Sequence, residues 1–172
     1  MHTVEETIEV AVPVSTAYNQ WTQFKTFPRF MTVVKKVEHV RPAFTTWTMA
    51  VGPVRREFQA EIVDQEPDAR VSWRSLGGSP AHRGDVTFRA MAADRTEVTV
   101  RIHIAPRGPA RVLPGIARIA GRVVRDELRH FKEYIEGLGE ATGAWRGTIR
   151  DGRVRPEEPK PHRSRVARWP VG

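Results

Sequence analysis

The sequence contains no cysteine among its 172 residues. A chain without cysteine forms no disulfide and offers no thiolate for catalysis or metal binding. It also lacks an uninterrupted apolar run of the eighteen or so residues that a membrane-spanning helix needs. Residues 1–6 are acidic and do not resemble a secretory signal, so the sequence predicts a cytoplasmic protein.

Sequence motifs of several common enzyme classes are missing as well. There is no Walker A motif, no dinucleotide-binding glycine fingerprint and no G-x-S-x-G nucleophile elbow. The six histidines show neither H-E-x-x-H nor any other close ligand spacing. We therefore expect no metal site and no cofactor, and kinase, dehydrogenase and hydrolase functions have no residues to support them.

The net charge of +8 is unevenly distributed along the chain. Residues 1–140 carry 20 Lys and Arg against 17 Asp and Glu, whereas residues 141–172 carry 8 against 3. The basic residues of the tail are spread out and interrupted by glutamates and prolines, which favours a solvated extension. The tail could contact anionic surfaces weakly, or act as a basic adaptor, but no specific nucleic-acid partner is expected.

Length and composition indicate one folded domain. The chain is 40% hydrophobic and 28% charged, and its length fits a single core. We expect a ligand-binding domain over residues 1–140 and a mobile Pro- and Arg-rich tail over residues 141–172. Within the tail, Asp151-Gly152 could form a hairpin turn, but two strands alone are only marginally stable.

The first thirty residues predict a strand followed by two short helical segments. Across residues 3–12, apolar side chains fall mostly at even positions and Thr or Glu at odd positions, which is the pattern of a half-buried strand. Pro13 ends this strand, and apolar residues then recur at helical spacing from Ala17 to Phe24. The aromatic-rich segment 27–31 predicts a second short helix or turn.

Six further strands are expected between Val33 and Ile104, because short alternating segments are separated by turn-forming residues. Such regular spacing predicts an antiparallel meander with one buried face, which another element must cover. Alternation assigns to the buried face Trp47, Met49, Val51, Phe58, Ala60, Ile62, Val71, Trp73, Val86, Phe88, Ala90, Val98, Val100, Ile102 and Ile104.

The covering element is a long helix near the C-terminus. From Leu113 to Ile135, apolar residues follow one stripe at spacings of three and four, and basic residues occupy the opposite side. Gly137 and Gly139 are expected to end this helix.

This order of elements, β-α-α-β6-α, resembles the START-like (SRPBCC) superfamily, in particular its polyketide cyclase/dehydrase and coenzyme Q-binding branch. The resemblance covers residues 3–138 and depends on several short motifs. They are Pro13-Val14 with Tyr18 and Trp21, Phe27-Pro28-Arg29-Phe30-Met31, Trp47, Pro67-Asp68-Ala69-Arg70-Val71-Ser72-Trp73, Gly84-Asp85-Val86-Thr87-Phe88, Thr96-Glu97-Val98-Thr99-Val100 and Phe131-Lys132-Glu133-Tyr134-Ile135-Glu136.

The resemblance implies an α+β helix-grip fold, in which a curved seven-stranded antiparallel sheet surrounds a long C-terminal helix. It also implies a cavity between sheet and helix that binds or transports a hydrophobic small molecule such as a lipid, quinone or polyketide. The alternative function is a polyketide cyclase or dehydratase that uses the same cavity. Aromatising members of the superfamily tend to place an inward Arg on the middle strands, where this sequence has Ala60 and Ile62.

The candidate binding residues are mostly large apolar side chains, which could equally form ordinary core. Among polar residues, Glu6, Arg56 and Ser75 fall in phase with inward neighbours, and Glu127 interrupts the apolar stripe of the helix. Arg56 or Glu127 could orient a ligand or transfer a proton, or could reach solvent at the edge of its element. The predicted ligand-binding residues are Phe30, Met31, Trp47, Met49, Arg56, Phe58, Ile62, Trp73, Phe88, Val100, Ile102, Val124, Glu127 and Leu128, and no catalytic residue is assigned.

Overall fold

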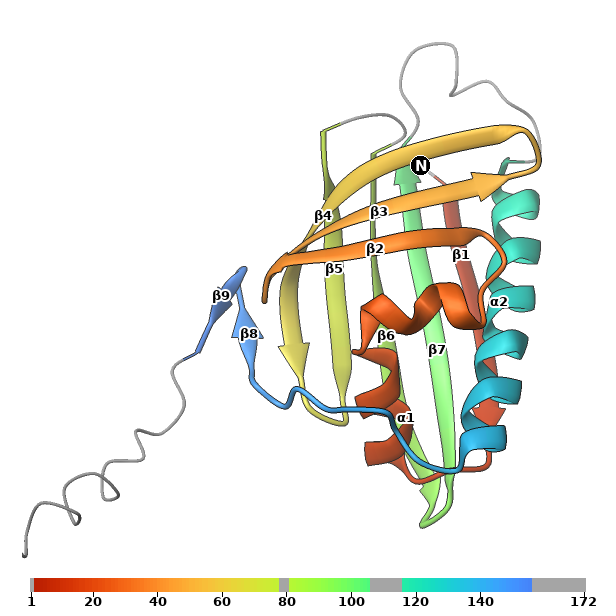
Figure 1. The fold of residues 1–172 in the computed structure, drawn as a ribbon, viewed down its shortest axis with the longest axis vertical. Coiled ribbons are helices and arrows are strands. Elements are labelled where there is room, and N and C mark those ends of the chain that lie inside the picture. The colour runs from red at the N-terminus through yellow and green to blue at the C-terminus, as the bar shows by residue number, and fades with distance from the viewer. Residues whose placement is uncertain (1, 78–80, 106–115, 156–172) are drawn as a thin grey trace, which may run out of the picture.

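A computed structural model describes residues 2–77, 81–105 and 116–155 of the chain. Its central element is a curved antiparallel sheet in the order β1-β7-β6-β5-β4-β3-β2 (Figure 1). The strands of this path are β1 (His2–Val10), β2 (Val34–Arg41), β3 (Phe44–Val51), β4 (Val54–Glu66), β5 (Arg70–Leu76), β6 (Ala81–Ala92) and β7 (Arg95–Ala105). The predicted six-strand meander is confirmed, and β1 closes it by pairing with β7.

Three helices lie on the concave side of the sheet (Figure 1). They are α1 (Val14–Trp21), the 3₁₀ helix η1 (Phe24–Arg29) and the long helix α2 (Ile116–Leu138). The predicted order of elements and the α+β helix-grip fold are therefore confirmed. No helix in the described ranges is long and apolar enough to cross a membrane.

Alternation along the strands decides which side chains face the helices. On β7, Val98 and Val100 are buried, whereas Arg101 is exposed and forms an ion pair with Glu5 of β1. Two residues that alternation assigned to the buried face, Val51 and Ala90, are exposed. Both lie beside hairpin turns, near the ends of their strands.

An aromatic cluster connects the helices to the sheet. The ring of Trp21 lies 5.0 Å from that of Phe131 on α2 and 5.3 Å from that of Phe27 on η1, both edge to face. Tyr18 and Phe88 pack in the same geometry at 5.4 Å. Each such pair adds about 0.5–1.5 kcal/mol beyond the burial of its area. This cluster anchors α1, η1 and α2 to one another and to β6.

The chain beyond α2 runs across α1 and returns to the sheet at β8 (Figure 1). We call residues 141–150 the strap. Its last two residues form β8 (Ile149–Arg150), which pairs with Asp64 and Gln65 of β4 and with β9 (Arg153–Val154). Strand β3 pairs only with residues 54–61 of β4, so the lower half of β4 has a free edge that β8 occupies.

Side-chain contacts hold the strap in place. Arg146 forms an ion pair with Asp68 at 2.8 Å, donates to the Asn19 side chain at 2.6 Å and lies over the Tyr18 ring. The buried Gln20 accepts a hydrogen bond from the Thr142 backbone N–H at 2.7 Å. The beginning of the tail, which we expected to be mobile, instead packs against the domain. Its hairpin is not isolated, because β4 supplies a third strand. Residues 156–172 lie outside the described residues.

We expect Ile149→Ala to lower the free energy of unfolding by about 2–4 kcal/mol, because truncating a fully buried isoleucine leaves a cavity. Ile149 is 1% exposed, although it belongs to the tail. The measurement is urea denaturation, with Val154→Ala as control, since Val154 on the partner strand is 42% exposed. Equal effects of the two substitutions would show that the strap does not dock on β4.

Candidate ligand-binding site

Two apolar cavities lie between the sheet and the helices. The first, the sheet cavity, has a volume of about 120 Å³. Residues from α1, η1 and strands β3 to β6 form its walls. They are Trp21, Phe24, Phe27, Thr45, Trp47, Met49, Phe58, Ala60, Ile62, Val71, Trp73 and Val86.

The second, the helix cavity, has the same volume of about 120 Å³ and lies against α2. Its walls are Trp21, Met31, Val33, Val34, Met49, Val100, Val123, Val124, Glu127 and Leu128. Trp21 and Met49 belong to both walls, so these two side chains separate the cavities. A methionine side chain is flexible and adapts its shape easily.

The structure brings most of the predicted binding residues to these cavities. Those on the sheet cavity are Trp47, Met49, Phe58, Ile62 and Trp73. Those on the helix cavity are Met31, Met49, Val100, Val124, Glu127 and Leu128.

Four predicted residues lie elsewhere. The Phe30 ring stacks on Tyr134 at 4.6 Å, and Phe88 packs against Tyr18 in the core. Ile102 is partly buried against the core without lining either cavity. Arg56 is exposed near the turn of the β3–β4 hairpin, and its guanidinium donates to the Arg55 carbonyl. Arg56 therefore lines neither cavity.

Three aromatic residues of the sheet-cavity wall were not predicted from the sequence to bind a ligand. They are Trp21, Phe24 and Phe27. Their helical spacing was visible and predicted an inward-facing short helix. Only the tertiary structure shows that the rings of Phe24 and Phe27 pack against Trp47 of β3 and line the same cavity as Ile62. Their aromatic character alone could not separate a cavity wall from ordinary core.

The sheet cavity contains one polar side chain, Thr45, and the hydroxyl is already engaged. It donates to the Ala60 carbonyl at 3.2 Å and accepts from the Trp47 indole N–H at 2.8 Å. Tyr18 lies behind the wall, and burial raises its pKa to about 12, so it stays neutral. The cavity surface is therefore suited to apolar molecules and offers few polar partners.

A hydrogen-bonded pair orients Trp73 in the wall of the sheet cavity. The indole Nε1 donates to His82 Nδ1 at 3.3 Å, which requires an unprotonated His82. Burial lowers the pKa of His82 below its ordinary value of 6.5 and so favours this state. Gly84 makes room for the indole, because a Cβ there would lie 2.7 Å from the ring.

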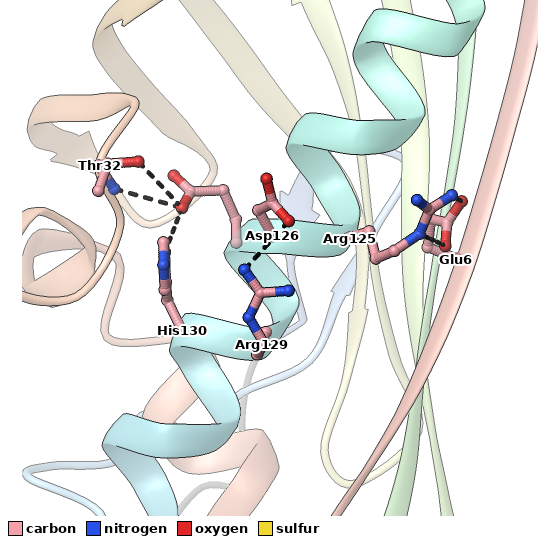
Figure 2. A network of polar contacts seen from close by, with 7 residues as sticks. Glu6, Thr32, Arg125, Asp126, Arg129 and His130 are labelled. Carbon is pink, nitrogen blue, oxygen red and sulfur yellow. Dashed lines mark hydrogen bonds and ion pairs between the residues drawn. The ribbon is translucent and has the colours of Figure 1, made fainter.

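Glu127 is buried, yet its carboxylate does not point into the helix cavity as a free polar group. It accepts a hydrogen bond from the Val33 N–H at 3.0 Å. It also accepts one from the Thr32 N–H at 3.2 Å and contacts His130 Nδ1 at 2.7 Å (Figure 2). Figure 2 also shows Arg125 on the opposite side of α2, paired with Glu6 of β1. Glu127 therefore joins α2 to the segment that follows η1.

The two remaining polar residues in phase with inward neighbours also have structural partners. Glu6 pairs with Arg125 at 3.2 Å, and the Ser75 hydroxyl accepts from the His82 backbone N–H at 2.9 Å. Among residues 2–77, 81–105 and 116–155 there is no cluster of three or more His, Asp or Glu side chains that could hold a metal ion.

A curved antiparallel sheet that a C-terminal helix closes over an apolar interior defines the helix-grip class of proteins. Residues 10–133 match the family described as polyketide cyclase / dehydrase and lipid transport. The chain belongs to this family. The resemblance inferred from the sequence motifs is therefore confirmed.

Similar proteins come from several bacteria. A 17.2 kDa protein of Streptomyces lincolnensis, encoded in the melC2–rnhH intergenic region, is 42% identical over 149 residues, which are 87% of this chain and 99% of that protein. The crystal structure of DR_A0006 from Deinococcus radiodurans is 29% identical, with a TM-score of 0.61 over 79% of this chain and 98% of the other.

Two further solved structures share the fold at low sequence identity. A START superfamily protein from Mycobacterium smegmatis is 16% identical, with a TM-score of 0.65 over 80% of this chain and 97% of the other. The Zhui aromatase/cyclase from Streptomyces sp. R1128 is 15% identical, with a TM-score of 0.65 over 80% of this chain and 93% of the other. At these identities the similarity shows the fold alone.

We expect Glu127→Gln to lower the free energy of unfolding by about 1–3 kcal/mol, because an amide nitrogen then faces a backbone N–H and a buried donor loses its acceptor. Urea denaturation measures the loss, and Glu133→Gln on the exposed side of α2 is the matched control. A loss no larger than that of the control would mean that Glu127 does not hold the segment after η1.

The lowered pKa of His82 predicts a pH dependence of stability. As the pH falls through about 6.5, the unfolded chain takes up a proton at this histidine while the folded chain does not. The contribution of unprotonated His82 to the free energy of unfolding is therefore complete above about pH 6.5, and it declines as the pH falls toward the pKa of His82 in the folded chain. The stability difference between the wild type and His82→Gln should therefore be larger at pH 7.5 than at pH 5.5.

Two measurements check this expectation. Urea denaturation of both proteins across the range gives the stability difference directly. Titration of the histidine rings by NMR should give a folded pKa for His82 below 6.5. A pKa at or above that value would contradict the proposed burial and the hydrogen bond from Trp73.

Proposed function

We propose that this protein binds a hydrophobic small molecule, such as a lipid, a quinone or a polyketide-like aromatic, in the space between its sheet and α2, and that it acts as a carrier. The observation that carries this proposal is the pair of apolar cavities whose walls share Trp21 and Met49. An apolar space that offers no partners for water is a favourable site for an apolar ligand.

The small size of the cavities implies that a larger ligand displaces side chains when it enters. Each cavity alone accepts only a small molecule, whereas displacement of Met49 would join them. Such a ligand gains about 25 cal/mol for each Å² of apolar surface removed from water. The aromatic rings of Trp21, Phe27 and Trp47 in the cavity wall would stack on a flat ring of a ligand or pack against an acyl chain.

The polar groups of the cavity walls favour a carrier over a cyclase or dehydratase. Acid–base chemistry on a bound ketone needs a titratable group within hydrogen-bond reach of it. Of the described wall residues, Thr45 is engaged with Ala60 and Trp47, and Glu127 is engaged with Thr32 and Val33. A cyclase would have to release one of these groups from its structural partners.

We expect Ala60→Phe to weaken binding of the neutral apolar dye N-phenyl-1-naphthylamine at least about tenfold, because the new ring occupies the sheet cavity. Ala60 is 3% exposed in the wall of that cavity. The measurement is a fluorescence titration, preceded by thermal unfolding to verify the fold, since added core volume costs about 1–3 kcal/mol. Ala90→Phe, at an exposed position of β6, is the matched control.

Native mass spectrometry of gently purified protein, followed by organic extraction, identifies any molecule that the protein carries. A bound apolar molecule released unchanged supports the carrier function. A cyclised or dehydrated product would instead favour the enzyme. Failure of the wild type to bind the dye would contradict the proposal, because the cavities would then be filled by movements of the protein's own side chains.

A further inference from the structure

A surface groove with basic residues lies directly outside the sheet cavity. It has a volume of about 450 Å³ and is formed by the end of α1, η1, the end of β2 and the strap. Phe24 is the residue that lines both this groove and the sheet cavity. Its side chain is 6% exposed and therefore acts as the partition between a solvent-facing space and the apolar interior.

The charges around the groove have one sign. Lys25 and Arg41 contribute to its walls, and neither forms an ion pair with a carboxylate of the described residues. The Arg41 guanidinium lies over the Phe44 ring at 4.6 Å, at the end of β2, and Arg41 lines both the groove and the neighbouring hollow that contains Phe44. No Asp or Glu of the described chain lines the groove. A monovalent or divalent anionic group is therefore complementary to this site.

The strap completes the groove with an aromatic wall. Trp145 lines the groove together with His39 and Phe24. The absence of a side chain at Gly147 lets the indole of Trp145 lie against the strap, because a Cβ there would fall 2.5 Å from the ring. Gly143 lies similarly close to Gln23, where a Cβ would approach the amide oxygen to 2.8 Å. The two glycines thus allow the strap to bring Trp145 to the groove.

We infer that the groove binds the anionic head of an amphiphilic ligand whose apolar part occupies the sheet cavity, with Phe24 turning aside to connect the two spaces. This inference depends on the proposed function and adds to it the chemical class of the ligand, an apolar or aromatic body with one carboxylate, sulfonate or phosphate group. Lys25 and Arg41 attract the anion, and Trp145 and His39 enclose the region where head and body join.

Two dyes of nearly equal shape test the inference. The anionic dye 1-anilinonaphthalene-8-sulfonate carries a sulfonate on the ring system of the neutral N-phenyl-1-naphthylamine. We expect the wild type to bind the anionic dye more tightly at low salt, and the double variant Lys25→Gln/Arg41→Gln to weaken its binding about tenfold, with the affinity for the neutral dye unchanged within about twofold. One surface ion pair changes affinity by up to about fivefold.

Matched controls separate this site from the general basicity of the chain. Lys35→Gln removes an exposed charge of the neighbouring β2 surface outside the groove and should leave both affinities unchanged. Sodium chloride at about 0.5 M should reduce the preference for the anionic dye, because it screens exposed charges. Equal losses in the double variant and in Lys35→Gln would overturn the inference.

The Ala60→Phe variant distinguishes a failure of this inference from a failure of the proposed function. If the groove and the sheet cavity hold one ligand, Ala60→Phe weakens both dyes. Loss of the neutral dye alone would place the anion in a separate surface site and overturn the inference, while the proposed function would stand. Absence of neutral-dye binding to the wild type would contradict both. An unchanged anionic preference in the Lys25→Gln/Arg41→Gln variant would overturn the inference alone.

Discussion

Trp21 is the side chain on which the arrangement of this protein depends most. It is the last residue of α1, it packs edge to face with Phe27 and Phe131, and its ring contributes to the walls of both cavities. A single helix cannot cover the concave face of a curved seven-stranded sheet, so α1 and η1 must bury the remainder. Trp21 joins these covering elements to α2 and leaves space on either side of its own ring.

Polar contacts fix the segments that the aromatic cluster does not reach. Glu127 holds the chain after η1, and Arg146 and Gln20 hold the strap against α1 and the β4–β5 turn. These contacts are charge-assisted or buried, which makes them costly to leave unmade. They position Val33 and Trp145, which line the helix cavity and the groove, so the same interactions that stabilise the fold also shape its binding surfaces.

The residues that sequence reasoning placed correctly are those whose pattern is local. Period-two alternation placed Trp47, Ile62 and Trp73 on the inner face, where they line the sheet cavity. It failed for Arg56, which is exposed near the β3–β4 turn, because alternation gives the face of a strand but not how far along the strand that face is buried. For Glu127 the sequence indicated a buried carboxylate but not its partners, since Thr32 and Val33 are about ninety-five residues away in the chain.

The sequence by itself determined the order of elements, the buried face of each strand, the apolar stripe of α2 and the family, because these depend on local periodicity and short motifs. The tertiary structure decided which apolar side chains line a cavity and that the strap docks on β4. It also placed Lys25, Arg41 and Trp145 around one groove. These features depend on sheet curvature and on contacts between distant segments, which local pattern does not encode.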